Sequence, residues 1–199
     1  MRLLLHSLVA VVSILLLTAG GTHGQTGKTG SFTSPLATGV RLDPAGDFID
    51  LGSMPLAMAL APAGDKLIVV LSGWREQGIQ VVDLKSKRVT QTLKQDAAFF
   101  GVAFSSNGQE LYVSGGNDDS IFCYSWKNGT AAFERKIVLG TQKPDKTGSR
   151  YPAGLAFSKR GNLLYVAENV GDTLAIVDPA TSKVIQRLPT DHYPYAVEA

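Results

Sequence analysis

The sequence contains a repeated segment, and this repeat constrains the fold more than any other feature. Three units align, beginning at Pro55, Phe99 and Pro152, and a fourth begins at Pro194. Each complete unit opens with an apolar segment that runs into a turn, and the three turns carry Gly64, Gly108 and Gly161. Glycine adopts a positive φ at little cost in such turns. Recurrence of one pattern in the same order predicts a repeat architecture.

Within each unit the apolar pattern indicates four short strands. In the third unit these are residues 155–157, 164–166, 174–178 and 184–188, and no segment of the chain shows a sustained helical period. Four antiparallel strands in about 40 to 45 residues are typical of a β-propeller blade. We therefore expect an all-β chain with about three complete four-stranded blades, in each of which the apolar first strand is innermost. A β-sandwich with coincidental spacing is the alternative.

The two ends of the repeat region resemble parts of blades. Residues 40–51 are similar to the third and fourth strands of a unit, because Asp-Pro-Ala at 43–45 matches Asp-Pro-Ala at 178–180. Propellers close with four to eight blades. We expect a partial propeller over 39–199, whose ring is not closed within this chain. It would contain a hairpin at 40–51, blades at 55–98, 99–151 and 152–193, and the start of a further blade at 194–199. In the third unit, the side chains expected to face that further blade are Leu155, Phe157, Tyr165, Val166 and Ile176.

The N-terminus has the pattern of a signal peptide. Arg2 precedes an apolar run at 8–17, and small residues follow, so that cleavage after Gly21 or Gly24 fits the small-x-small rule. An uncleaved anchor is the alternative, but the run is shorter than the ~20 residues that span a bilayer. We predict a signal peptide at 1–24, a flexible linker at 25–38, and a periplasmic or secreted protein with no other membrane association.

Composition limits the available chemistry. The formal net charge is only +2, and Lys and Arg are scattered singly, so no nucleic-acid surface is expected. Cys123 is the single cysteine, which excludes an intrachain disulfide and a Cys-x-x-Cys-His haem motif. Outside the predicted signal peptide the one histidine is His192. A multi-histidine metal site is therefore excluded, a Ser-His-Asp triad would have to use His192, and no cofactor or metal is expected.

Two stretches resemble a known repeat. Residues 165–169 read Tyr-Val-Ala-Glu-Asn and are followed by Leu-Ala-Ile-Val-Asp at 174–178, while residues 111–114 read Leu-Tyr-Val-Ser. This pattern is similar to the YVTN repeat of YncE-like β-propellers. The resemblance implies a propeller of the seven-bladed type. The first unit departs from it with Leu-Ile-Val-Val at 67–70, and Ala167 and Glu168 replace the Thr-Asn of the motif. The resemblance covers about residues 55–199 and concerns core and turn positions.

Three functions are compatible with this resemblance. The preferred one is a non-catalytic scaffold that binds a small molecule or a protein. Residues 72–83 also resemble the propeller half of fusions with a metal-dependent phosphoesterase, which implies that any such activity would lie beyond Ala199. A lactonase-type propeller enzyme is a further alternative, by analogy of fold alone.

Candidate binding residues lie in the loops that vary between units, as binding loops on a fixed scaffold do. Trp74, Arg75 and Glu76 offer a stacking plane and a charged pair, unless Trp74 covers a neighbouring blade. The remaining candidates are Asn117, Asp118, Glu168, Asn169, His192 and Tyr193. The first four of these carry oxygen ligands suited to a hard cation, although the favoured interpretation is that they are ordinary solvated turn residues. His192 is either a base or a plain exposed side chain.

Overall fold

The computed structural model describes residues 38–39 and 46–199 of the chain. The predicted signal peptide, all but the last residue of the predicted linker, and residues 40–45 of the predicted hairpin lie outside this part. The remaining part of that hairpin, residues 46–51, contains no strand.

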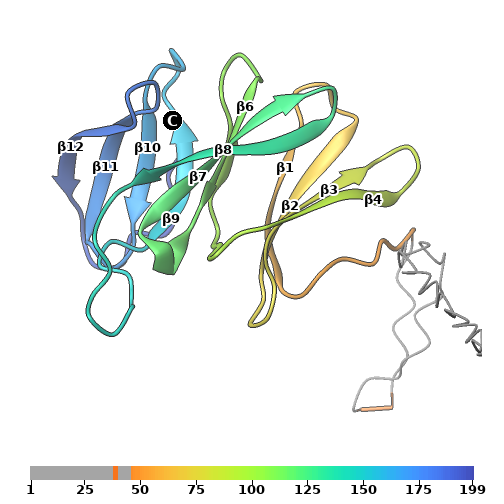
Figure 1. Ribbon diagram of the computed structural model, residues 1–199, viewed down its shortest axis with the longest axis horizontal. Helices are drawn as coiled ribbons and strands as arrows, with labels where there is room; N and C mark the ends of the chain where they lie inside the picture. Colours follow the sequence, from red (N-terminus) through yellow and green to blue (C-terminus); the bar gives the residue numbers. More distant parts are fainter. Residues whose placement is uncertain (1–37, 40–45) are drawn as a thin grey trace, which may run out of the picture.

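Twelve strands of the described residues form three sheets in a row (Figure 1). Blade 1 contains β1 (Pro55–Leu60), β2 (Lys66–Ser72), β3 (Gln77–Asp83) and β4 (Arg88–Lys94). Blade 2 contains β5 (Val102–Phe104), β6 (Glu110–Ser114), β7 (Ser120–Lys127) and β8 (Thr130–Val138), with the short 3₁₀ helix η1 (Gly116–Asp118) between β6 and β7. Blade 3 contains β9 (Pro152–Phe157), β10 (Leu164–Glu168), β11 (Thr173–Asp178) and β12 (Lys183–Pro189). Strands pair antiparallel in chain order within every blade, which confirms the predicted architecture.

The repeated glycines form the turns between the first two strands of each blade. Gly64, Gly108 and Gly161 have φ values of 74°, 67° and 72°, a region in which a side chain is unfavourable. The first strands of adjacent blades contact one another, β1 with β5 and β5 with β9. The first strand is therefore the innermost strand of each blade, as the sequence predicts.

Apolar side chains alternate between the two faces of each strand and produce two apolar layers, one between blades 1 and 2 and one between blades 2 and 3. In β6, Leu111 and Val113 face blade 1 and pack with Ile68 and Val70 of β2. Tyr112, between them in sequence, faces blade 3 instead. Successive residues of a strand point to opposite faces, so one strand contributes to both layers. Full burial of each such side chain stabilises the fold by roughly 1.5–3 kcal/mol.

The outer face of blade 1 is covered by the segment that precedes β1. Ile49 packs on Val69, Leu71 and Val82, and the Gly52 N–H donates a hydrogen bond of 2.9 Å to the side chain of Gln80. Residues 46–54 therefore cover the outer face of blade 1 without forming a strand.

One expectation about blade 3 is wrong. The sequence pattern suggested that Leu155, Phe157 and Val166 face away from blade 2, but all three pack in the layer between blades 2 and 3. Tyr165 and Ile176, which pair across β10 and β11, do lie on the far face. The residues between them in sequence face blade 2 because the side-chain period of a strand is two. Within the described ranges no helix has the length and apolar character needed to cross a membrane.

Candidate functional site: the loop face

All of the candidate residues lie at one end of the blades, here called the loop face. It consists of the β2–β3, β6–β7 and β10–β11 loops (73–76, 115–119 and 169–172), the end of β10 at Glu168, and the segments between blades (95–101, 139–151 and 190–194). The opposite end, the turn face, carries the glycine turns and the turns between the third and fourth strands. In Figure 1 the loop face is at the bottom of the picture.

A repeated hydrogen bond organises the loop face. A side chain just before or at the start of the third strand accepts from the backbone N–H of the residue that introduces the next blade. The acceptors are Gln77, Asp119 and Asp172, and the donors are Ala98, Tyr151 and Tyr193, at distances of 2.6, 2.9 and 2.9 Å. Blades 1 and 2 are thereby tied to their successors, and blade 3 is tied to the segment after β12. We call these contacts the inter-blade hydrogen bonds.

Asp119 is the most strongly held of the three acceptors. Its carboxylate is fully buried and accepts hydrogen bonds from the backbone N–H groups of Ser149, Arg150 and Tyr151 at 2.6–2.9 Å, and from the Ser149 hydroxyl at 2.8 Å. Burial raises the pKa of Asp119, but these hydrogen bonds outweigh it and hold the pKa below its usual range. Asp119 is therefore ionised at neutral pH and fixes the segment that precedes β9. Sequence reasoning missed this residue, although its alignment with Asp172 could have identified it.

Asn117 also holds the segment before β9, while Asp118 contacts β7 and β8. Asn117 accepts from the Gly148 N–H at 2.9 Å and donates to the Lys146 carbonyl at 3.0 Å. Asp118 accepts from the hydroxyl of Ser120 and pairs with Lys136 at 3.0 Å. Both predicted candidates thus make contacts that shape the loops.

Glu168 forms a buried ion pair. Its carboxylate is completely buried and accepts from Arg187 Nε at 2.8 Å, from Arg187 Nη2 at 3.0 Å and from the Thr173 hydroxyl at 2.5 Å. Arg187 also donates to the Leu139 carbonyl of blade 2 at 2.6 Å. A two-pronged Arg–carboxylate pair of this kind is strong and directional. The arrangement fixes β10, β11 and β12 to one another and to the end of blade 2.

The remaining polar candidates join the segment after β12. Asn169 donates to the Pro194 carbonyl at 3.2 Å, and His192 Nδ1 lies 2.8 Å from Asp172 Oδ2. The pKa of Asp172 is lowered mainly by the hydrogen bond from the Tyr193 N–H and, to a smaller extent, by the contact with His192. The side chains of His192 and Tyr193 are themselves exposed to solvent.

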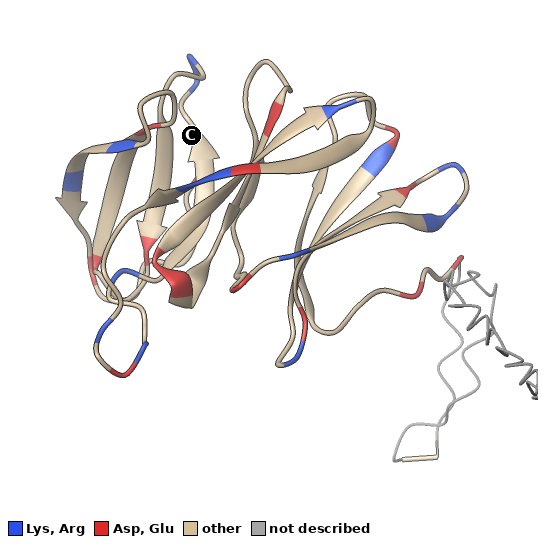
Figure 2. Cartoon of the chain, in the orientation of Figure 1, with Lys and Arg blue, Asp and Glu red and all other residues tan. Residues whose placement is uncertain are grey.

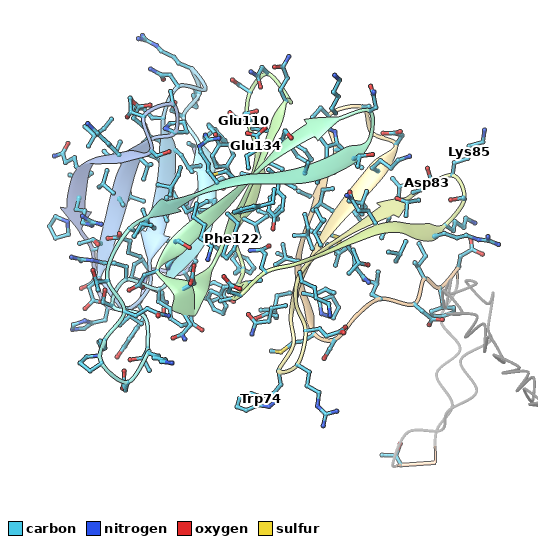
Figure 3. The ribbon with its side chains drawn as sticks, in the orientation of Figure 1. Trp74, Asp83, Lys85, Glu110, Phe122 and Glu134 are labelled. Carbon is cyan, nitrogen blue, oxygen red and sulfur yellow. The ribbon has the colours of Figure 1, made fainter. Side chains whose placement is uncertain are left out.

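Trp74, Arg75 and Glu76 occupy the tip of the β2–β3 loop. Trp74 is 97 % exposed, and Figure 3 shows it projecting from the end of the molecule. The expectation that Trp74 covers a neighbouring blade is therefore wrong. Glu76 lies 3.9 Å from Lys94. The pairing of Ser72 with Gln77 closes the base of the β2–β3 loop.

The candidates do not form one constellation. The described residues contain no group of three or more His, Cys, Asp or Glu side chains arranged to hold a metal ion. Segments with acidic and basic side chains are interspersed over all three blades (Figure 2). Sequence reasoning also missed an aromatic cluster beside the inner strands. In it, Phe99 contacts Tyr151 and Tyr195 edge to face, with ring centroids 5.0 and 5.7 Å apart.

The sequence and the structure are both similar to those of known β-propellers. Residues 101–194 match the family described as lactonase, 7-bladed beta-propeller. No curated protein matches the sequence. These sheets are blades of a β-propeller.

Solved propellers share this arrangement of blades at low identity. A proposed 6-phosphogluconolactonase from Bacteroides uniformis is 16% identical with a TM-score of 0.60, and the match covers 80% of this chain and 51% of that one. A functionally unknown protein from Desulfotomaculum acetoxidans is 17% identical with a TM-score of 0.58, covering 76% and 47%. Hydrazine synthase from Kuenenia stuttgartiensis is 18% identical with a TM-score of 0.54, covering 71% and 38%. The matched region is thus between about two-fifths and half of these structures' length.

Proposed function

We propose that these residues form the scaffold of an exported β-propeller that binds a small molecule or a protein through its loop face. The observation that carries the proposal is Trp74, which is 97 % exposed at the tip of a loop anchored by two strands of a buried sheet. Large exposed aromatic side chains on rigid loops are typical anchors of binding interfaces. Arg75 and Glu76 beside it supply charge for recognition.

The fixed loops support the same reading. The carboxylates of Asp119, Asp172 and Glu168 are engaged in contacts within the protein, which rigidify the platform around the exposed side chains. A preorganised surface binds with less loss of conformational freedom. The ligand-facing groups are then Trp74, with its charged neighbours, and Tyr193.

The test is to screen the purified chain against immobilised arrays of defined peptides and oligosaccharides. Each binder is then measured against Trp74→Ala and against Phe133→Ala, a matched variant whose ring is 53 % exposed on β8. We expect Trp74→Ala to weaken binding at least tenfold and Phe133→Ala to leave it unchanged. Equal affinities for wild type and Trp74→Ala would refute the loop face as the binding surface.

Export is tested separately. Expression of the full sequence should place the protein outside the cytoplasm, with a mass reduced by loss of residues 1–24 or a similar segment. A variant that lacks these residues should remain in the cytoplasm. Cytoplasmic retention of the full sequence would contradict the proposal.

Lactone hydrolysis is the second candidate, because the family that matches residues 101–194 is a lactonase family. A full-length protein that contains this chain should be assayed with 6-phosphogluconolactone and an unphosphorylated lactone, with spontaneous hydrolysis as the control. Turnover above the spontaneous rate would favour this candidate over a scaffold. The phosphoesterase alternative concerns residues beyond Ala199 and stays a prediction.

A further inference from the structure

A groove of about 420 Å³ lies on the turn face between blades 2 and 3. The β5–β6 turn of blade 2 forms one side of it, and the β9–β10 and β11–β12 turns of blade 3 form the other. Its volume is within the range of roughly 300–1,000 Å³ that small-molecule sites occupy. None of the candidate residues of the loop face lines it.

One lining residue of the groove is much smaller than its counterpart in the preceding blade. The strand registers place Tyr124 of blade 2 and Val177 of blade 3 at equivalent positions, so that Trp126 corresponds to Pro179 two residues later. Between blades 1 and 2, the Trp126 ring packs edge to face on Phe104, with centroids 5.3 Å apart. In blade 3 the smaller Pro179 leaves the equivalent space open.

The groove has an apolar wall and a polar rim. Phe157 and Ile185 supply the apolar surface, and Ile185 is 60 % exposed. The rim includes two asparagines whose Oδ1 atoms are fixed: Asn107 accepts from the Gln109 N–H at 3.0 Å, and Asn162 from the Ser158 hydroxyl at 3.3 Å. Their Nδ2 groups have no partner among the described residues, so these donors are available to a ligand.

The positive charge beside the groove is already paired. Glu110 pairs with Arg135 at 3.1 Å. Asp178 accepts from the Ala180 N–H at 2.9 Å and from the Thr181 hydroxyl at 2.8 Å. An anionic ligand would therefore find no unpaired counter-charge here, whereas a neutral one can share the remaining lone pairs of these carboxylates.

We propose that this groove binds a neutral sugar ring. The C–H face of such a ring matches the apolar surface of Phe157 and Ile185, while its hydroxyls can accept from the free amide donors and donate to the carboxylate oxygens. A few placed polar groups around an apolar surface are the usual composition of a small-molecule site. The site is separate from the loop face, so its occupation does not depend on the function proposed above.

The experiment is a titration of the ¹⁵N-labelled full chain with maltose, followed through the side-chain amide signals of asparagine. We expect shifts in the signals of Asn107 and Asn162 with millimolar affinity, and no saturable shift with glycerol, which lacks a ring. Pro179→Trp, which places in blade 3 the residue found in blade 2, should weaken binding at least tenfold. Lys183→Trp puts the same ring on β12 outside the groove and should leave affinity unchanged.

A second variant guards against misfolding of the first. Asn107→Asp combined with Asn162→Asp keeps both Oδ1 acceptors and the turns but removes the two donors. We expect at least a tenfold loss of maltose affinity with an unchanged backbone spectrum. No saturable shift with maltose, equal shifts with glycerol, or wild-type affinity in both groove variants would each overturn the proposal.

Discussion

The two junctions between blades have the same backbone arrangement and different contents. Between blades 1 and 2, Trp126 fills the turn-face end against Phe104. Between blades 2 and 3, Pro179 takes the place of the tryptophan and a groove remains. The comparison shows that the repeat determines where strands and turns lie, while the side chains at equivalent positions differ and with them the packing of the space between blades.

The largest expected effect on stability comes from replacing Trp126 of blade 2 with proline, the residue that blade 3 has at the equivalent position. Trp126→Pro removes the ring from Phe104 and also the N–H that donates to the Gln109 carbonyl at 2.7 Å. We expect a loss of about 3–5 kcal/mol in the free energy of unfolding, measured by chemical denaturation. Trp126→Ala keeps the N–H and should cost less. Equal stability of Trp126→Pro and wild type would show that this ring does not support the first junction.

The inter-blade hydrogen bonds allow a second comparison. Asp119→Asn removes the charge of a buried carboxylate and turns an amide group toward backbone N–H groups, at a cost of about 2–3 kcal/mol. Asp172→Asn alters the equivalent but more exposed contact of blade 3, so its effect on the free energy of unfolding should be clearly smaller. Equal losses in the two variants would contradict the role assigned to burial.

The contribution of Asp119 depends on pH in a defined direction. Its pKa is lowered in the folded state, so its stabilisation is present above the unfolded pKa of about 3.9. As pH falls through the lower folded value, this contribution is lost. The difference in unfolding free energy between wild type and Asp119→Asn should be constant from about pH 7 to pH 5 and shrink below about pH 4. A difference that grows on acidification would reverse the assigned sign.

The smallest effect is expected on the loop face. Trp74 is 97 % exposed, so Trp74→Ala should change the free energy of unfolding by no more than about 0.5 kcal/mol. The same denaturation experiment measures it, with Phe104→Ala as the contrasting loss of a packed ring. A large destabilisation by Trp74→Ala would mean that the side chain packs against the protein in solution.

The fold was predictable because the repeat carries its own evidence. Apolar alternation, the glycine turns and their order along the chain together predict three blades, and the strands confirm them. The prediction for the far face of blade 3 was partly wrong. A period of two shows that Leu155 and Phe157 share a face, but it does not reveal which neighbouring blade covers that face.

The candidate site was less accessible to sequence reasoning. Asn117 lies in a loop as expected, but Glu168 is the buried last residue of β10, and the sequence alone does not show that their side chains are engaged by Gly148 and Arg187. The groove was missed because its volume depends on Pro179 standing where blade 2 has Trp126. That difference is visible only when strand registers align the repeats at this position.

The inter-blade hydrogen bonds also have a consequence for how the chain folds. Each one joins the start of a third strand to the residue that introduces the next blade, about twenty to thirty residues later, as from Gln77 to Ala98. Pairings of such short separation favour fast folding. Each bond can form as soon as the beginning of the following blade has been synthesised, before the rest of that blade exists. The propeller can therefore assemble in the order of translation, with every completed blade presenting a fixed edge on which the next one forms.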